Sequence, residues 1–209
     1  MRKKLILVGG GGHCKSCIEV IESCDKFEIS GILDKIIGKT VLGYPIIGND
    51  DLIPNLIKEG YEFLITVGQT KSPAIRVKLY DFIKNNGGKL ATIIAKTAIV
   101  SKHNQIGEGT IIMHGAFVNA ECSIGNNCII NSRAVLEHEV KIGNHCHISV
   151  NTVLNGNVKV NEKTFIGSCA VVNEGVEIPA NSVVGANSTV IDSPKIAGTY
   201  VGSPSRLIS

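Results

Sequence analysis

The chain has 209 residues and a formal net charge of +3 at pH 7, a length that fits one large domain or two modest ones. Nucleic-acid binding needs a concentrated basic face. No basic run is denser than the triplet at residues 2–4, so we expect no nucleic-acid partner. No stretch approaches the ~20 apolar residues of a membrane span, and the apolar run at residues 5–8 is too short for a signal peptide. We therefore expect a cytoplasmic protein without a membrane partner.

Cysteine usage predicts neither disulfides nor a metal. The seven cysteines are an odd number, and the lone CxxC, formed by Cys14 and Cys17, lies where a helix should begin. A structural zinc site needs paired CxxC units or interspersed histidines. We interpret the cysteines as reduced thiols that act as small hydrophobic side chains, and we expect no bound metal.

Residues 1–88 carry the pattern of a small α/β domain. A short apolar run ends in four glycines at residues 9–12 and is followed by a helical pattern. Further elements are predicted as strands at 27–34 and 62–68, a helix at 72–85 and a strand at 89–94. Strands that alternate with helices indicate a parallel sheet of the doubly wound, Rossmann-like type.

The glycines stand at a strand-to-helix turn, which gathers backbone N–H groups and a helix N-terminus where an anion can bind. We assign binding of an anionic substrate group to Gly11, Gly12 and His13 at this turn. A non-glycine residue breaks the GxGxxG pattern, which disfavours a nicotinamide oxidoreductase. Asp34 follows about twenty residues later, where an acid commonly contacts a nucleotide ribose. The alternative is a solvated aspartate at a strand end.

From residue 94 onward the sequence repeats every six residues. Every sixth residue from Ile94 to Ile196 is isoleucine, leucine or valine. The residue four positions after each of these is usually small. The residue one position after is usually glycine or asparagine, which tolerate positive φ and so predict sharp corners. This hexapeptide pattern is typical of a left-handed parallel β-helix, to which we assign residues 89–209 with a C-terminal tail. Three repeats make one coil, so each residue stacks on the residue three repeats away, about 4.8 Å from it.

His138 points outward from its coil because it follows an inward aliphatic by two positions. Its stacking neighbours are Ala120 and Gly156, which are small enough to leave a groove around the imidazole. A neutral histidine oriented by a carboxylate can serve as a general base that takes the proton from an attacking amine or hydroxyl group. We interpret His138 as this base; the alternative is a solvated surface histidine. Glu139 is the adjacent candidate for the carboxylate, although on a straight strand it would point away, as would Glu137.

His147 lies half a coil after His138, so the two histidines occupy opposite sides of the prism. They cannot share an active site within one chain. In a threefold assembly, the His138 edge of one chain can meet the His147 edge of the next. We therefore predict a homotrimer with the active site between subunits and with His147 against the acyl donor. The alternative is that His147 is an ordinary corner residue.

Several stretches carry a resemblance to known enzymes. They are LGYPIIGND (42–50), NTVLNGNVKVNEKTFIGSCAVVN (151–173) and VGSPSRLI (201–208), which resemble the bacterial sialic acid O-acetyltransferases. A second set resembles the nucleotide-amino-sugar N-acetyltransferases of the bacillosamine pathway: the GGH loop at 11–13, Asn131, EHE at 137–139, and His147. Both branches are sugar acetyltransferases that join a small Rossmann-like domain to a left-handed β-helix.

The resemblance implies that the protein uses acetyl-CoA as co-substrate and works as a homotrimer. It implies that His138 is the general base and Glu139 its orienting carboxylate. It further implies that His13 and Asp34 lie toward the sugar or nucleotide-sugar acceptor, with Asn131 among the substrate-binding residues.

The resemblance also implies where the coenzyme lies. In this class the pantetheine arm runs along the groove between prisms, where small residues matter more than charged ones, so Gly143, Gly167 and Ala186 are the expected contacts. The ending GSPSR resembles the family's Gly-x-Pro-Ala-Lys/Arg tail, and this implies that Arg206 meets the coenzyme phosphates. The alternative for Arg206 is a solvated C-terminal charge.

Three functions remain open. The first, which we favour, is O-acetylation of a sialic-acid-type sugar in bacterial surface-glycan synthesis. The second is N-acetylation of a UDP-4-amino-4,6-dideoxy sugar. The third is a non-catalytic β-helix scaffold such as an ice binder, which would need a flat ladder of threonines. EHE at 137–139 interrupts one face instead. We therefore expect an acetyltransferase.

Overall fold

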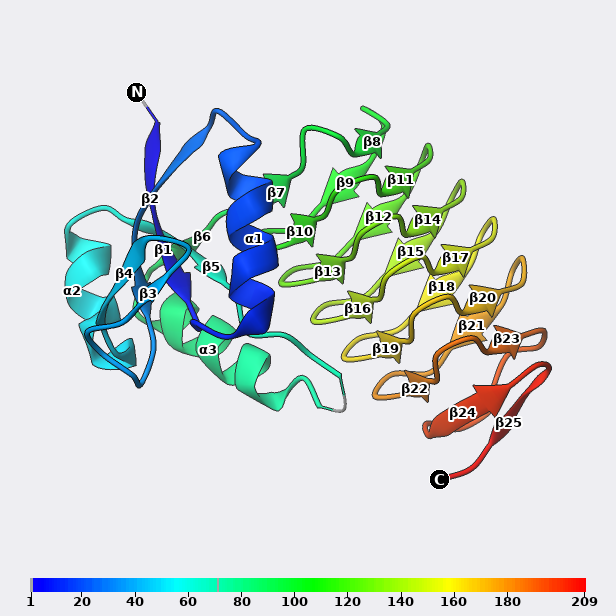
Figure 1. The fold of residues 1–209 in the computed structure, drawn as a ribbon. Coiled ribbons are helices and arrows are strands. Elements are labelled where there is room, and N and C mark those ends of the chain that lie inside the picture. The colour runs from blue at the N-terminus through cyan, green and yellow to red at the C-terminus, as the bar shows by residue number, and fades with distance from the viewer. Residues whose placement is uncertain (1, 71) are drawn as a thin grey trace.

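The computed structural model describes residues 2–70 and 72–209, which form two packed domains (Figure 1). The N-terminal domain is a six-stranded sheet in the order β3-β4-β2-β1-β5-β6, parallel except for the β3-β4 hairpin. Its strands are β1 (Lys3–Val8), β2 (Phe27–Leu33), β3 (Thr40–Val41), β4 (Tyr44–Gly48), β5 (Glu62–Ile65) and β6 (Lys89–Leu90). The predicted Rossmann-like sheet is confirmed.

Helices cover both faces of this sheet (Figure 1). They are α1 (Gly12–Glu22) on one face, and α2 (Ile53–Lys58), preceded by a 3-10 turn at Asp50–Leu52, with α3 (Ala74–Asn85) on the other. Cys14, Cys17 and Ile18 of α1 join one apolar cluster with Ile111 and Ile129 of the β-helix. The first helix is therefore one of the elements through which the two domains pack. Among the described residues, no helix is long and apolar enough to cross a membrane.

Two parts of the N-terminal domain differ from the prediction. The β3-β4 hairpin and α2 were not foreseen, because the hairpin strands are only two and five residues long and alternate too briefly to show a period. The sheet also continues past residue 88, the expected end of the domain, because β6 pairs with β5. The strands of the second domain begin at β7.

The second domain is a left-handed parallel β-helix, as predicted, in which each coil adds one short strand to each of three sheets (Figure 1). The docked face, whose first coils the N-terminal domain covers, consists of β7 (Ile93–Ile94), β10 (Ile111–Ile112), β13 (Ile129–Ile130), β16 (His147–Ile148), β19 (Phe165–Ile166) and β22 (Val183–Val184), extended by β24 (Thr199–Gly202) and β25 (Ser205–Leu207). The apolar face consists of β8 (Ile99–Val100), β11 (Phe117–Val118), β14 (Val135–Leu136), β17 (Val153–Leu154), β20 (Val171–Val172) and β23 (Thr189–Val190). The polar face consists of β9 (Gln105–Ile106), β12 (Ser123–Ile124), β15 (Lys141–Ile142), β18 (Lys159–Val160) and β21 (Glu177–Ile178).

The interior of the β-helix is built from the predicted six-residue series. Its members from Ile112 to Val190 are all buried, together with the small residues that follow four positions later. The two ends of the series were predicted wrongly, because Ile94 is 38% and Ile196 is 59% exposed. In several earlier coils, the residue four positions after the inward aliphatic closes a corner by donating its N–H to the carbonyl three residues before it. Pro194 occupies this position after Val190 and has no N–H to donate. The chain loops out there, and β24 rejoins the docked face beside β22.

The corners of the β-helix also differ from the prediction. Positive φ recurs at the third residue after each inward aliphatic, as at Glu139 (φ 62) and His145 (φ 60), rather than at the first. The glycines one residue after the inward aliphatics are explained by the stacking of coils instead. A Cβ on Gly143 or Gly167 would lie 2.6 or 2.5 Å from a backbone nitrogen of the next coil. Close stacking of coils therefore requires glycine at these positions.

Candidate active site

The glycine loop joins β1 to α1 at the carboxyl edge of the N-terminal sheet. Gly9 has φ +107, and a Cβ there would lie 2.5 Å from Val67, so the fold itself requires glycine. Gly11 and Gly12 are different, because their φ is not positive and a Cβ on either would meet nothing within 4 Å. Among residues 2–70 and 72–209, no side chain caps α1, so N–H groups of its first turn face the space in front of these glycines without a capping partner. That space is open to a ligand.

Asp34 follows β2 and is held against this loop. Its carboxylate accepts hydrogen bonds from the N–H of Gly10 at 2.6 Å and from the N–H of Lys35 at 2.6 Å. These two bonds fix the orientation of the carboxylate. The structure thus brings Asp34 to the same edge of the sheet as the three loop residues that we assigned to an anionic substrate group.

The strand order places a topological switch point between β1 and β5, and we call the region in front of it the crevice. The chain leaves β1 toward β2 on one side and reaches β5 on the other, and open α/β sheets bind ligands at such a switch point. The loop after β5 is pinned in place. Thr66 Oγ1 donates to the carbonyl of Gly9 at 2.6 Å, and the carbonyl of Gln69 accepts from Nδ1 of His147 at 2.6 Å. The crevice is therefore bounded by the glycine loop, the loop after β5 and the docked face.

His147 lies inside this crevice rather than on an edge of the prism. It is 6% exposed, and its Nε2 accepts a hydrogen bond from Nδ2 of Asn131 at 3.0 Å. Its ring centroid lies 6.5 Å from that of His13. The expectation that His147 faces a neighbouring subunit is wrong, because the N-terminal domain of its own chain covers it. Asn131 and His147 instead lie beside His13, between the two domains of one chain.

Burial keeps the two histidines of the crevice neutral. Burial, followed by the nearby charge of Arg76, lowers the pKa of His13 to about 3, and burial lowers the pKa of His147 to about 4. Arg76 is itself buried on α3, where it donates to the carbonyl of Val67 at 2.7 Å and to Oδ1 of Asn127 at 2.7 Å. At neutral pH both imidazoles are therefore uncharged hydrogen-bonding groups. Arg76 ties the loop after β5 to a corner of the β-helix.

Two side chains in the crevice have polar atoms without a partner. Gln69 is 3% exposed, and within residues 2–70 and 72–209 neither its Oε1 nor its Nε2 is hydrogen-bonded. The same holds for Nε2 of His13. A buried polar group without a partner costs roughly 1–3 kcal/mol, and such groups are rare in folded proteins. The sequence analysis missed Gln69, because it belongs to no motif and only the packing of the two domains buries it.

His138 projects from the corner between the apolar face and the polar face. Its side chain is 56% exposed, and its Nδ1 lies 3.1 Å from Oε2 of Glu139. Glu139 occupies the left-handed corner, so its side chain is turned back toward His138 instead of pointing away as on a straight strand. A carboxylate at Nδ1 favours the tautomer in which Nε2 can accept a proton. The other candidate carboxylate, Glu137, instead accepts a hydrogen bond from Asn119 at 2.8 Å.

The next coil leaves space for the imidazole. A Cβ on Gly156 would lie 2.7 Å from Nε2 of His138, so a larger residue there would collide with the ring. The predicted clearance on this side of His138 is therefore present. An exposed imidazole with a free Nε2 and room around it can act as a general base.

The residues assigned to the coenzyme do not lie on one edge. Gly167 and Ala186 lie at the corner between the docked and apolar faces, on successive coils. Gly143 lies at the corner between the polar and docked faces, where Asn127 contacts α3. Arg206 is exposed on β25, where it donates to the carbonyl of Ser205. One groove can therefore include Gly167 and Ala186 but not Gly143.

The three faces of the β-helix differ in their outward side chains. The outward residues of the apolar face remain partly or fully exposed in the single chain: Ile99, Phe117, Val135, Val153 and Val171. Those of the polar face are all exposed: Gln105, Ser123, Lys141, Lys159 and Glu177. The apolar face is thus a continuous hydrophobic strip that the single chain leaves uncovered, and His138 stands at its border.

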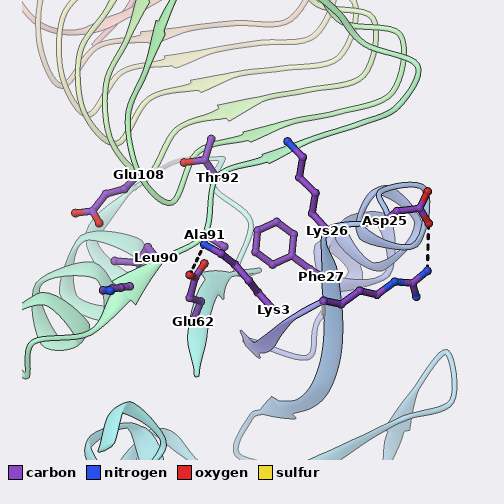
Figure 2. Close-up of a pocket in the computed structure, with 11 residues that line it drawn as sticks. Lys3, Asp25, Lys26, Phe27, Glu62, Leu90, Ala91, Thr92 and Glu108 are labelled. Atoms are coloured by element: carbon purple, nitrogen blue, oxygen red, sulfur yellow. Dashed lines mark hydrogen bonds and ion pairs between the residues drawn. The ribbon is translucent and has the colours of Figure 1, made fainter. Parts of the chain in front are cut away.

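A cavity of about 930 Å³ lies at the opposite edge of the N-terminal sheet, near the first residues of β1, β5 and β6 (Figure 2). Its charges are largely paired. Lys3 lies 2.7 Å from Glu62, and Arg2 lies 3.1 Å from Asp25. None of the residues that line it is a histidine or a cysteine. This cavity is separate from the crevice, and two of its three carboxylates are held in ion pairs with Lys3 and Arg2. The described part of the chain has no cluster of histidine, cysteine or acidic side chains that could hold a metal ion.

Comparisons with known proteins agree with this architecture in both halves. Residues 4–83 match the family model of the PglD N-terminal domain. Residues 103–138 and 121–156 match that of the bacterial transferase hexapeptide (six repeats). The chain therefore has the architecture of a hexapeptide-repeat acyltransferase. No curated protein matches it.

Solved structures match over the whole length. The acetyltransferase domain of PglB from Neisseria gonorrhoeae FA1090 is 28% identical with a TM-score of 0.92, and the match covers 99% of this chain and 100% of that one. PerB from Caulobacter crescentus, solved with CoA and GDP-perosamine, is 32% identical with a TM-score of 0.91 and coverages of 99% and 97%. The chain belongs to this family of hexapeptide-repeat sugar acetyltransferases, which carry a PglD-type N-terminal domain.

Proposed function

We propose that the protein transfers the acetyl group of acetyl-CoA to the amino group of a nucleotide-activated amino sugar. The observation that carries the proposal is the His138–Glu139 pair, an exposed imidazole with a carboxylate at its Nδ1, which stands at the border of the uncovered apolar face. The relatives support both substrates, since PerB was solved with CoA and GDP-perosamine and the PglB domain with acetyl coenzyme A. The seven free cysteines suit the reducing cytoplasm, where we place the reaction.

The proposed reaction is a direct transfer. Nε2 of His138 accepts a proton from the amine as its nitrogen attacks the thioester carbonyl. The C–N bond forms, the C–S bond breaks, and the coenzyme leaves as a thiolate that takes up the proton. Glu139 holds the reactive tautomer and stabilises the imidazolium that forms.

The N-terminal domain binds the acceptor in this proposal. The unpaired N–H groups of the first turn of α1 favour the negative charge of a pyrophosphate, and Gly11 and Gly12 let it approach the backbone closely. Asp34 stands where it can accept a hydrogen bond from the ribose. The donor needs none of these groups, so the two domains divide the two substrates.

We propose that the working unit is a homotrimer in which the apolar faces pack around the threefold axis. A hydrophobic strip of this length on a soluble domain marks an interaction surface, and closed symmetric assemblies bury such strips. The strip is bordered by His138 at one corner and by Gly167 and Ala186 at the other. Threefold packing brings the first corner of one chain to the second corner of the next. The pantetheine arm then runs between them, with Arg206 available to the coenzyme phosphates.

Sialic-acid O-acetylation, favoured from the sequence, is the second candidate. The longest stretch behind it, residues 151–173, lies in β17 to β20 of the β-helix. The acceptor crevice is formed instead largely by the N-terminal domain. In the N-terminal domain this resemblance rests on residues 42–50 alone. It therefore carries less weight for the acceptor than the identity to PerB, which extends over the whole chain.

The test is an assay with acetyl-CoA and four acceptors: GDP-perosamine, a UDP-4-amino-4,6-dideoxy sugar, sialic acid and CMP-sialic acid. Cys169 is exposed and would react with thiol reagents, so the product is followed by its mass. A product that resists hydroxylamine, formed only from an amino sugar, supports the proposal. A hydroxylamine-sensitive ester on a sialic acid favours the second candidate. Absence of any product together with absence of coenzyme binding contradicts both.

A further inference from the structure

The loop after β5 holds Gln69 rigidly in the crevice. Its carbonyl accepts the Nδ1–H of His147, and two residues earlier the carbonyl of Val67 accepts a hydrogen bond from Arg76. Gly68 lies against His13, since a Cβ there would be 3.4 Å from the Cβ of His13. The backbone is therefore constrained at Gln69 and at the two residues before it, which limits how far the side chain can move to find a partner.

The Gln69 amide is nonetheless unpaired. Both of its polar atoms and Nε2 of the neighbouring His13 lack hydrogen bonds within the described residues. Native proteins pair nearly all buried polar atoms with protein, water or ligand. These two side chains lie at the switch point of the sheet, beside the N-terminus of α1, which no side chain caps. Their position indicates that a polar ligand supplies the missing hydrogen bonds.

The order of the strands indicates which part of the ligand does so. Asp34, the glycine loop and Gln69 follow β2, β1 and β5, which are neighbours in this order. A nucleotide sugar laid along this edge places its ribose at Asp34 and its pyrophosphate at the glycine loop. The hexose is the next group along the edge. Its hydroxyl groups both donate and accept, and an amide offers one donor group and one acceptor to match them.

We infer that Gln69 is a specificity-determining residue that hydrogen-bonds the hexose of the acceptor, next to His13. This inference rests on the proposed function. A site built to pair with a hydroxyl group rejects an analogue that lacks it, because the buried amide is then left unpaired. Gln69 therefore selects the sugar, whereas Asp34 and the glycine loop hold the nucleotide that carries it.

The experiment compares Gln69→Met with Gln105→Met, which alters the only other glutamine of the chain, exposed on the polar face. Methionine has a similar volume and no hydrogen-bonding amide. Calorimetry measures binding of GDP-perosamine and a UDP-4-amino-4,6-dideoxy sugar, and of GDP and UDP alone. We expect Gln69→Met to weaken binding of the nucleotide sugar by about 10–100-fold, as for the loss of hydrogen bonds from a buried site. Binding of the free nucleotide and of acetyl-CoA, and the Tm, should stay as in Gln105→Met.

Each other outcome is decisive. Equal weakening toward nucleotide sugar and free nucleotide, or no weakening, overturns the assignment of Gln69 to the hexose. A clear fall in Tm shows that the folded protein itself uses the amide and overturns it as well. If the unmodified protein binds neither nucleotide sugar, the proposed function fails and the inference fails with it. If the unmodified protein binds one and Gln69→Met binds it equally well, only the inference fails.

Discussion

The crevice and the outer corner of the β-helix hold histidines in opposite environments. His13 and His147 are kept neutral in the crevice between the domains, whereas His138 is exposed on a corner and paired with Glu139. A buried neutral imidazole can orient a ligand through hydrogen bonds. An accessible imidazole with a carboxylate partner can take up and release a proton. The comparison therefore supports the proposed division of roles, in which His13 and His147 position the acceptor and His138 with Glu139 transfers the proton.

The largest effect should come from separating the subunits, because the proposed site needs two chains. Val153→Glu puts one carboxylate per chain into the apolar face, where burial without a partner is strongly unfavourable. We expect the trimer to dissociate in sedimentation experiments and turnover to fall with it. Ser123→Glu adds the same charge to the polar face and should leave both unchanged. A trimeric, active Val153→Glu would show that the apolar face is not the subunit contact.

Removing the exposed imidazole should abolish proton transfer while sparing the crevice. His138→Ala is expected to lower kcat by ~10²–10⁴, the scale for loss of a general base. Coenzyme binding, acceptor binding and Tm should change little, because the side chain is 56% exposed and contacts only Glu139 through hydrogen bonds. Steady-state kinetics with matched binding measurements check this. Near-normal turnover would remove His138 from the mechanism.

A side chain in the glycine loop should affect only the acceptor. Gly11→Val adds atoms to space that no other residue fills, in an extended backbone conformation that valine adopts readily. The variant should therefore fold normally. We expect the KM for the acceptor to rise by about 10–100-fold, for the loss of one or two charge-assisted contacts, with the KM for acetyl-CoA unchanged. Ser16→Val, one turn further along α1 and exposed, is the control. A selective rise in the acetyl-CoA KM would reverse the assignment of substrates to domains.

The smallest effect is on stability at mild acid pH. The pKa of His147 is about 4 in the folded protein, against an ordinary value of 6.5. Between these values the unfolded chain binds more protons, so stability falls as the pH falls, by about 2 kcal/mol between pH 7 and pH 5 for one such histidine. Denaturation of His147→Gln should show a weaker pH dependence than that of the unmodified protein. His103→Gln, at an exposed histidine, should not differ from the unmodified protein. Equal slopes for all three would mean that the buried imidazole is not kept neutral by the fold.

The sequence alone determined the β-helix and the outward position of His138. Both follow from a repeat in which the neighbours of each residue lie at fixed spacing along the chain, so local pattern and three-dimensional packing coincide. Gly156 could be identified as the residue that gives the imidazole room for the same reason. The parallel sheet and the glycine loop with Asp34 were equally readable, because strand ends and the turn between strand and helix leave a local signature.

Only the tertiary structure decided which residues the N-terminal domain covers where it packs on the docked face of the β-helix. Arg76 and Asn127, which lock the two domains together, are 51 residues apart, and no repeat relates them. Their contact buries His147, which the half-coil spacing had placed on a free edge, and it encloses Gln69, which no motif marked. The orientation of Glu139 was undecided for a different reason. It depends on a left-handed backbone corner that falls on the third residue after each aliphatic, and glutamate has no intrinsic preference for that conformation. Packing of the coils imposes it, and the carboxylate reaches His138 as a result.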